Sequence, residues 1–288
     1  MKVCVIVFSP SGHTLEVAEM MKTAMEKDGM CVQLLNVTKS EMVFNKNAVK
    51  DFLLKEVKEH DLLCIGGPVY AGHLENNVKE LIRALPQPDE KWGKLVIPFV
   101  TYGGVHSSIA MQEAGELLFS RNRINIMGVK LASYHTLTKT LPFEVNKGKP
   151  DNGEKIVIQE MIQRLKSIIH ANEAKDVRNS FYYAKPIERM IFKVLSQDFL
   201  HKKYRTVEID SGKCSQCGIC EKKCPVNLIK KSNDEYIVNN TQNCLLCGEC
   251  YHSCKSKAIN FEYIEKAGAY LSKNRNKLEH PQSAVYPQ

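Results

Sequence analysis

Eight of the eleven cysteines in this 288-residue sequence lie in two runs of identical spacing near its C-terminal end. Each run reads C-x2-C-x2-C-x3-C, and the second follows the first at an offset of 30 residues. Three thiolates at two-residue steps can bind three corners of a cubane, while the fourth is carried to the other cluster. We therefore expect two 4Fe-4S clusters, one held by Cys214, Cys217, Cys220 and Cys254 and the other by Cys244, Cys247, Cys250 and Cys224.

Zinc is the alternative for these thiols, since C-x2-C pairs also suit a tetrahedral zinc site. A third cysteine at the same two-residue step, present twice, favours iron-sulfur clusters. With this pattern, residues 206–262 resemble the bacterial two-cluster 4Fe-4S ferredoxins, which implies a small α+β ferredoxin-like domain. One departure is that Pro225 follows the fourth cysteine of the first run, whereas Lys255 occupies that place in the second. The departure removes no ligand.

The other three cysteines, Cys4, Cys31 and Cys64, lie in predicted strands, where we expect small buried apolar groups. Disulfides are typical of short secreted chains. Here the first eight residues form an apolar run with one lysine and no small-residue cleavage site, and no apolar stretch approaches about 18 residues. We therefore expect a cytoplasmic protein without stable membrane insertion, whose clustered cysteines bind metal.

A second group of residues with chemical potential lies in the loop Ser9-Pro10-Ser11-Gly12-His13-Thr14. It follows an apolar run and precedes a helical pattern, so hydroxyl groups, backbone N–H groups and the positive end of a helix dipole would converge there. This combination can bind a phosphate dianion without a lysine. The alternative is an ordinary capping turn, because Ser and Thr are common before helices.

The segments around this loop alternate between short β-branched runs and amphipathic stretches over residues 1–170. This alternation is typical of a doubly wound α/β domain, in which helices cover both faces of a parallel sheet. The expected strands are Lys2–Phe8, Cys31–Val37, Asp61–Gly66, Lys94–Thr101 and Ile124–Leu131. The expected helices are Gly12–Lys27, Asn47–Glu59, Leu74–Leu85, Ser107–Ser120 and Gly153–His170.

Two further loops follow the third and fourth strands and would share the sheet edge with the first. Tyr70 or Tyr102 in these loops could stack on a flavin ring, or be buried for structural reasons alone. The arrangement resembles the flavodoxin family, which implies FMN and a five-stranded sheet in the order 2-1-3-4-5. His13, where many members have Asn, and Pro10 depart from the family pattern. The candidate cofactor-binding residues are Ser9, Ser11, Gly12, His13, Thr14, Pro68, Val69, Tyr70, Ala71, Gly72, Thr101, Tyr102, Gly103 and Gly104.

Three histidines, His73, His106 and His135, could supply protons near a flavin, although a surface or hydrogen-bonding role is commoner for histidine. No G-x-G-x-x-G follows a predicted strand, so the sequence does not support a nicotinamide-binding domain.

A basic amphipathic segment, residues 171–205, joins the two parts of the chain. It carries Ile187, Ile191, Val194 and Leu195 at helical spacing, and we expect this face to be packed between domains rather than to lie on a membrane. Residues 263–288 form a charged C-terminal tail that either packs back onto the protein or is mobile.

The order of the two domains resembles the fused ferredoxins of anaerobic bacteria and archaea called the EFR1 family, which implies electron transport. We expect an oxygen-sensitive iron-sulfur flavoprotein that relays electrons between FMN and two 4Fe-4S clusters, to or from redox partner proteins. The alternatives are a flavin-dependent reductase of a small organic substrate, or a ferredoxin with a flavin-free docking domain. For the expected electron carrier we assign no catalytic residue.

The formal net charge of +8 is concentrated in residues 151–205, with 11 basic against 7 acidic residues. Flavin phosphate and thiolate-bound clusters would add negative charge, so the value gives little support to a nucleic-acid partner. Near the cysteines, Lys213, Lys222, Lys223 and Lys255 either form a solvated face or dock an acidic redox partner.

Overall fold

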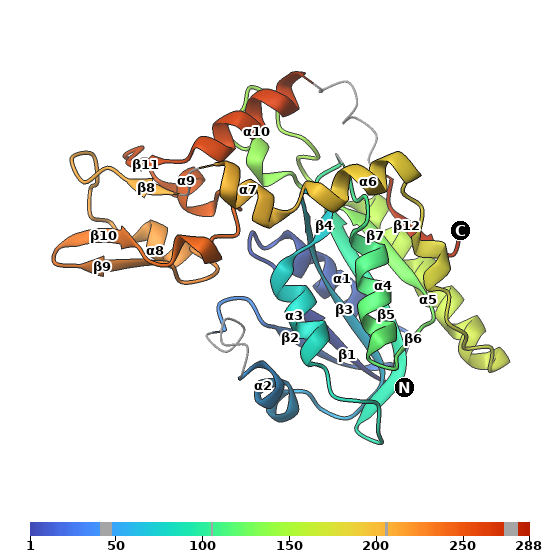
Figure 1. Ribbon diagram of the computed structural model, residues 1–288. Helices are drawn as coiled ribbons and strands as arrows, with labels where there is room; N and C mark the ends of the chain where they lie inside the picture. Colours follow the sequence, from blue (N-terminus) through green and yellow to red (C-terminus); the bar gives the residue numbers. More distant parts are fainter. Residues whose placement is uncertain (41–47, 105, 205–206, 274–281) are drawn as a thin grey trace.

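The computed structural model describes residues 1–40, 48–104, 106–204, 207–273 and 282–288. The chain forms a larger lobe built around one sheet and a smaller lobe that projects from the carboxyl end of its strands (Figure 1). None of the helices in the described ranges is long and apolar enough to cross a bilayer.

The larger lobe contains the parallel strands β1 (Lys2–Val7), β2 (Cys31–Asn36), β3 (His60–Tyr70), β5 (Trp92–Tyr102) and β7 (Gly128–Ala132). They lie side by side in the order β2-β1-β3-β5-β7. The central strands are buried along most of their length because helices cover both faces, which explains their continuous apolar runs. This part of the chain therefore has a flavodoxin-like α/β fold.

Two local features differ from the predicted strands. The run 124–131 is divided into β6 (Ile124–Asn125) and β7, and both parts pair with β5. The third strand continues beyond Gly66 to Tyr70 and turns back into the two-residue strand β4 (His73–Leu74). Cys4 and Cys64 are buried as expected, but Cys31 is exposed because it begins the edge strand β2.

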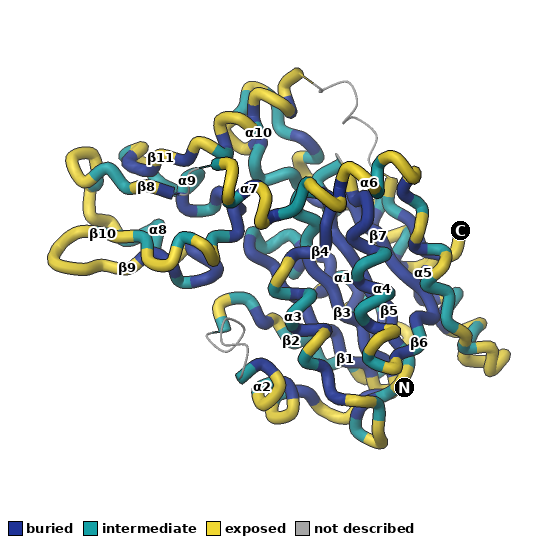
Figure 2. The backbone as a smooth tube through the Cα atoms, in the orientation of Figure 1, coloured by how far each residue is buried: buried dark blue, intermediate teal, exposed yellow. Residues whose placement is uncertain are grey.

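Helices cover the two faces of the sheet and form separate cores. On one face, α1 (His13–Lys27) and α5 (Asn152–Ala171) bury Met21, Met25 and Leu165 against β1 and β7. On the other, α3 (Asn76–Ala84) and α4 (Ala110–Ser120) bury Leu81 and Leu118, and α2 (Val49–Glu56) contributes to the same core. Figure 2 shows the resulting buried centre and exposed outer helix faces.

The smaller lobe has two halves with matching backbone. Positive φ angles recur at the 30-residue offset: 56° and 57° at Gln216 and Leu246, and 71° and 80° at Gly218 and Gly248. One half contains β8 (Glu208–Ile209), α8 (Ile219–Lys223) and β9 (Ile229–Ser232). The other contains β10 (Glu235–Val238), α9 (Glu249–Ser253) and β11 (Ile259–Asn260). β9 pairs with β10 and β8 pairs with β11.

The linker forms η3 (Arg178–Phe181), α6 (Pro186–Val194) and α7 (Gln197–Lys203). The prediction that Ile187, Ile191 and Val194 are packed between domains is wrong, since they are 70%, 51% and 67% exposed. The helix is instead anchored by Phe192, which packs with Ile109, Ala184 and the partly buried Leu195.

The C-terminal tail packs back onto the larger lobe in the part that the structure describes. Its first element, α10 (Glu262–Lys273), buries Leu271 against Val145 and the neighbouring Leu141. Its last, β12 (Ala284–Tyr286), adds an antiparallel strand to the sheet beside β7. The chain therefore ends as a sixth strand next to the five parallel ones, a feature that the sequence did not predict.

Candidate redox site

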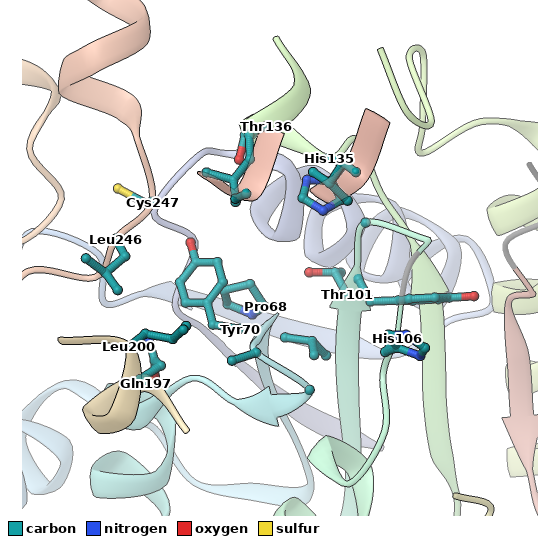
Figure 3. A pocket seen from close by; sticks show the side chains of 18 of the residues that line it. Pro68, Tyr70, Thr101, His106, His135, Thr136, Gln197, Leu200, Leu246 and Cys247 are labelled. Atoms are coloured by element: carbon teal, nitrogen blue, oxygen red, sulfur yellow. The ribbon is translucent and has the colours of Figure 1, made fainter. Parts of the chain in front are cut away.

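A cavity of about 680 Å³ lies where the carboxyl ends of β1, β3, β5 and β7 meet the smaller lobe (Figure 3). Helices α6, α7 and α10 and the loop 245–247 form its other walls. Its volume is within the range of about 300–1,000 Å³ that is typical of small-molecule and cofactor sites. A sheet with this strand order binds its ligand at this edge, where the strand order reverses.

All three predicted loops reach the cavity. Its wall includes Ser11, His13, Thr14, Pro68, Val69, Tyr70, Ala71, Gly72, Thr101, Tyr102 and Gly103. Of the predicted residues, Ser9, Gly12 and Gly104 are not part of the wall. Ser9 is buried, and its Oγ accepts the N–H of Leu15 at 2.8 Å, so it caps α1.

The N-terminus of α1 forms the polar part of the wall. The N-cap residue Gly12 has a φ of 92°, a left-handed conformation that favours glycine. Thr14 Oγ1 and Thr101 Oγ1 lie 2.7 Å apart in a buried hydrogen bond that joins the first loop to the end of β5. This helix end offers hydroxyl groups and the positive end of the helix dipole to an anion.

The second loop is a tight hairpin between β3 and β4. Ala71 and Gly72 have φ angles of 51° and 77°, as in the two-residue hairpin turns that need positive φ at both positions. A Cβ on Gly72 would lie 2.4 Å from the ring of Phe192, so the missing side chain lets α6 approach. By contrast, Gly66 and Gly67 lie within β3 and make room for Phe99 and Val78.

The hairpin places Tyr70 against the smaller lobe. Burial, followed by the nearby Cys247 thiol, raises the pKa of the Tyr70 phenol well above its ordinary value. In Figure 3 the phenol points toward Cys247, and Leu246 lies beside them. The wall therefore joins a predicted flavin loop to a predicted cluster ligand.

Several wall residues were not predicted from the sequence. Ser133, Tyr134, Thr136 and Leu137 follow β7, and the carboxyl end of that predicted strand was the available signal, whereas His135 in the same loop was already considered near the flavin. The others are brought in by the linker, the smaller lobe and the tail helix α10: Lys185, Ile187, Glu188, Ile191, Phe192, Leu195, Gln197, Leu200, Leu245, Leu246, Cys247, Tyr263, Ala267, Tyr270 and Leu271. No local pattern marks them, because only the tertiary structure places them at the cavity.

The histidines divide into two groups. His13, His106 and His135 line the cavity, and burial lowers the pKa of His135 to about 4, so this ring is neutral near pH 7. His73 is buried outside the wall and joins α6 to the larger lobe through hydrogen bonds to the Phe192 and Leu195 carbonyls.

The cysteines of the smaller lobe fall into two neighbourhoods. Burial raises the pKa of Cys220, and the Cys214 and Cys254 thiols raise it further. Burial likewise raises the pKa of Cys250, with Cys244, Cys224 and Cys220 as its electrostatic neighbours in decreasing order. The fourth cysteine of each half thus lies near cysteines of the other half, Cys254 near Cys220 and Cys224 near Cys250. Among the described residues, no group of three or more His, Cys, Asp or Glu side chains could hold a single metal ion.

Backbone N–H groups approach the two fourth cysteines in the same way. Leu228 N–H donates to Cys224 Sγ and Ala258 N–H donates to Cys254 Sγ, both at 3.3 Å. The comparison with family models agrees with this duplicated arrangement. Residues 213–259 match the 4Fe-4S dicluster domain.

Other comparisons cover the larger lobe. A flavodoxin from the domain Archaea has 16% identity and a TM-score of 0.38, with 59% of this chain and 100% of that chain covered. Flavodoxin 1 from Bacillus cereus has 12% identity and a TM-score of 0.40, with 58% and 98% covered. An FMN-dependent NADH-azoreductase from Bacillus anthracis has 9% identity and a TM-score of 0.40, with 57% and 99% covered. No curated protein sequence matches the chain.

The two cysteine loops of the dicluster domain differ in exposure. Leu245, Leu246 and Cys247 of the second loop are buried and face the cavity. In the first loop, Ser215, Gln216 and Cys217 are exposed. Figure 2 shows this exposed first loop at the end of the smaller lobe, away from the sheet. One loop therefore faces the larger lobe and the other faces solvent.

Proposed function

We propose that this chain is an electron-transfer flavoprotein that holds FMN in the cavity and two 4Fe-4S clusters in the dicluster domain. The observation that carries the proposal is that Cys247 and the three predicted flavin loops line the same cavity. When bound, FMN exchanges two electrons and each cluster exchanges one, so together they connect two-electron and one-electron chemistry. The division into a flavin part (1–170), a linker (171–205) and a cluster part (206–262) is part of this proposal.

The residues of the larger lobe have distinct proposed roles. Ser11 and Thr14 bind the phosphate at the N-terminus of α1, whose dipole favours an anion. Pro68–Gly72 and Thr101–Gly103 enclose the ring, with Tyr70 and Tyr102 as the aromatic groups. On the opposite wall, α6 and α10 exclude water from it.

The proposed cluster ligands follow the two thiol neighbourhoods. Cys214, Cys217, Cys220 and Cys254 form one set, and Cys244, Cys247, Cys250 and Cys224 form the other. The N–H donors of Leu228 and Ala258 stabilise thiolate charge on one ligand of each set. The second set is more deeply buried, because Cys224, Cys247 and Cys250 all belong to the buried core. Burial and hydrogen bonding to sulfur both tune a cluster potential.

The difference in exposure between the two cysteine loops indicates the order in which electrons would pass between the flavin, the two clusters and a partner. The set containing Cys247 adjoins the flavin cavity, and the set containing Cys217 adjoins solvent. Lys255 lies near the exposed Cys217 thiol and contributes to lowering its pKa, after the backbone N–H of Ile219 and the Ser215 hydroxyl. We infer that a redox partner protein docks over the first loop and carries acidic groups opposite Lys213 and Lys255. Cytoplasmic location and sensitivity to oxygen belong to the same proposal.

A second candidate function is a flavin-dependent reductase of a small organic substrate. The specific observation in its favour is the apolar wall on the solvent side of the cavity, where Ile187, Ile191 and Tyr270 are 70%, 51% and 55% exposed. His106 lines the same cavity and could supply a proton. Rapid reoxidation of the reduced protein by planar organic acceptors, at rates that saturate with acceptor concentration, would favour this function over the carrier.

The deciding experiment is the stoichiometry of flavin, iron and acid-labile sulfide after strictly anaerobic purification. We expect one FMN and about eight irons per chain, as two cubane clusters require. Full iron with no flavin, even after reconstitution with FMN, would overturn the flavoprotein and leave a ferredoxin with a docking domain. Zinc in place of iron would overturn the proposal of 4Fe-4S clusters.

A further inference from the structure

Lys130 of β7 is a buried cation surrounded by three tyrosine rings. Its Nζ lies 5.0 Å from the ring centroid of Tyr183, 5.5 Å from that of Tyr102 and 5.7 Å from that of Tyr286. The residue is only 9% exposed, and it forms no ion pair with a described carboxylate. Burial lowers the pKa of Lys130, and Glu188 on the facing linker partly opposes this. The aromatic faces therefore replace much of the hydration of this ammonium group.

The three rings come from distant parts of the chain. Tyr102 ends β5, Tyr183 belongs to the linker, and Tyr286 belongs to the C-terminal strand β12. Tyr183 and Tyr286 stack with their centroids 4.9 Å apart and an interplanar angle of 20°. The Tyr183 hydroxyl also donates to Ser107 Oγ at 3.0 Å. Lys130 thus holds the linker, the sheet and the C-terminal strand together.

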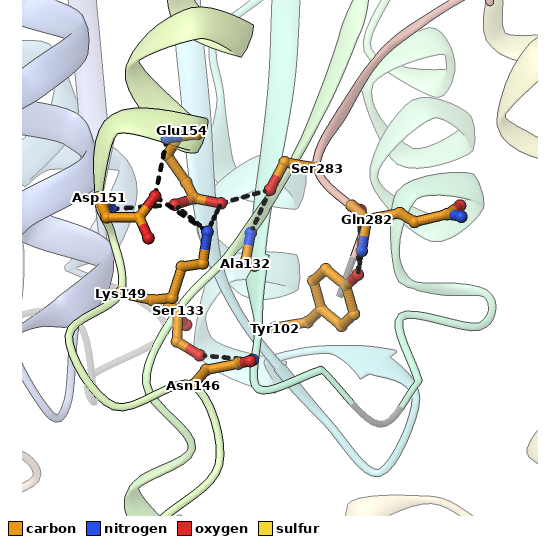
Figure 4. A network of polar contacts seen from close by, with 10 residues as sticks. Tyr102, Ala132, Ser133, Asn146, Lys149, Asp151, Glu154, Gln282 and Ser283 are labelled. Carbon is orange, nitrogen blue, oxygen red and sulfur yellow. Dashed lines mark hydrogen bonds and ion pairs between the residues drawn. The ribbon is translucent and has the colours of Figure 1, made fainter. Parts of the chain in front are cut away.

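Tyr102 is also bound directly to the C-terminal segment (Figure 4). Its hydroxyl donates to the Gln282 carbonyl at 2.9 Å and accepts the N–H of the same residue at 2.7 Å. The next residue, Ser283, accepts the N–H of Ala132 at 2.8 Å and donates to Glu154 at 2.7 Å. Both interactions lie at the carboxyl ends of β5 and β7, where Tyr102 and Ser133 line the cavity.

We propose that the C-terminal segment 282–286 and Lys130 form a clamp that positions Tyr102 in the wall of the flavin cavity. Lys130, Tyr183 and Tyr286 are outside the cavity wall, whereas Tyr102 is part of it, so they are positioning residues. Lys130 contacts the ring of Tyr102, and the backbone of Gln282 holds its hydroxyl group. The end of the chain is therefore part of the cofactor site.

The clamp has a reciprocal consequence. If the ordered C-terminal strand strengthens FMN binding, bound FMN must stabilise the pairing of that strand with β7 by the same free energy. The strand is short, and its register is Ala284 to Lys130, Val285 to Val129 and Tyr286 to Gly128. A strand of three residues at a sheet edge depends on such side-chain contacts, because its few backbone hydrogen bonds alone are marginal.

The inference rests on FMN binding, so its test compares variants with the wild-type chain. Tyr286→Ala removes one ring of the clamp, and Tyr286→Phe keeps the ring as the matched control. Lys130→Met removes the charge at similar length, and a chain ending at residue 281 removes the segment. Flavin-free protein is prepared anaerobically and titrated with FMN, with quenching of flavin fluorescence as the readout. Iron content and circular dichroism identify variants that remain folded.

We expect Tyr286→Ala, Lys130→Met and the truncated chain to bind FMN at least about 5-fold more weakly than wild type, and Tyr286→Phe to bind like wild type. Hydrogen exchange on the wild-type chain should slow at residues 284–286 when FMN is added. Wild-type affinity in folded Tyr286→Ala and Lys130→Met, with exchange at 284–286 unaffected by FMN, would overturn the clamp. A wild-type chain that binds no FMN would instead overturn the proposed function.

Discussion

Tyr70 and Cys247 face the same cavity, although one ends a strand of the larger lobe and the other belongs to a cysteine loop of the dicluster domain. The thiol acts electrostatically on the phenol, second only to burial in raising the pKa of Tyr70. A ligand held by the predicted flavin loops would therefore adjoin a cluster ligand. In the proposed relay, the flavin part and the cluster part would therefore meet within one chain.

The first prediction concerns the two cysteine loops. Cys217→Ser and Cys247→Ser should each lose one cluster, so the iron content should fall from about eight to about four per chain. Because Cys247 adjoins the cavity and Cys217 adjoins solvent, only Cys247→Ser should also change the absorption of bound FMN. Iron analysis and visible spectra of anaerobically purified protein measure both effects.

Cys31→Ser is the matched control for this pair, since Cys31 is an exposed thiol in the edge strand β2. It should retain all the iron. Full iron content in both Cys217→Ser and Cys247→Ser would show that these thiols are not ligands. Equal flavin spectra in the two variants would contradict the order of the clusters.

The second prediction concerns Glu75, which is fully buried at the N-cap of α3. Burial raises the pKa of its carboxyl to about 7, although N–H groups of Val78 and Asn77 favour the charged form. Between the ordinary carboxyl pKa and about 7, the folded state holds a proton that the unfolded state has lost. The free energy of unfolding should therefore fall as the pH rises through this window, by about 3 kcal/mol in total.

Urea unfolding between pH 5 and pH 8 measures this dependence. Glu75→Gln should flatten it, because the amide oxygen can still accept the N–H bonds of the cap but carries no charge. The exposed Glu19→Gln is the control and should keep the wild-type slope. An identical slope in Glu75→Gln and wild type would show that Glu75 does not carry a proton in this range.

The larger lobe could be predicted from the sequence because its information is local. Buried parallel strands are continuous apolar runs, and helices such as α1 repeat apolar residues at helical spacing, so the boundaries agree within a few residues. The apolar face of α6 was assigned to the interior by the same reasoning. This assignment was wrong, because Phe192 anchors the helix while Ile187, Ile191 and Val194 remain exposed.

The parts that could not be predicted depend on contacts between distant residues. The strand β12 has three residues before Pro287 and no periodicity, and its place follows from Tyr286 packing with Tyr183. The cavity wall was predicted where it consists of loops after strands, including Thr14, Tyr70 and Tyr102. Leu246 and Cys247 are part of the cavity wall because the smaller lobe packs against the larger one, and no sequence pattern in the larger lobe predicts this contact.

The third prediction separates two hydroxyl groups of the first loop. Thr14→Val removes a group that lines the cavity and pairs with Thr101, so we expect about a tenfold loss of FMN affinity, as for a hydrogen bond to a charged group. Ser9→Ala removes only the cap on Leu15, so it should lower the free energy of unfolding by about 1 kcal/mol and leave FMN affinity unchanged.

Fluorescence titration with FMN and urea unfolding together test this separation. If Ser9→Ala weakens FMN binding as much as Thr14→Val does, the phosphate contacts Ser9 as well, although Ser9 is not part of the cavity wall. Wild-type affinity in Thr14→Val would remove this residue from the site.

The fourth prediction concerns the anchor of α6. Nδ1 of His73 lies 2.8 Å from a carboxylate oxygen of Glu113, and Nε2 lies 2.6 Å from the carbonyl oxygen of Phe192. Both partners are acceptors, so each ring nitrogen of His73 faces a hydrogen-bond acceptor. Although burial opposes it, the hydrogen bond from His73 and the charge of Lys79 hold the pKa of Glu113 below its ordinary value, so the carboxylate stays ionised near pH 7.

His73→Phe should therefore release the C-terminal end of α6, because it removes both hydrogen bonds, of which the one to the charged Glu113 is worth about 1.5–3 kcal/mol. Trypsin should then cleave after the exposed Lys193 at least about tenfold faster, since each 1.4 kcal/mol of local stability is a factor of ten in the opened population. His170→Phe, at the exposed end of α5, should leave cleavage unchanged. Because α6 closes the cavity, FMN should slow the cleavage of wild type more than that of His73→Phe. Equal cleavage rates in all three chains would show that packing of Phe192, rather than His73, holds the helix in place.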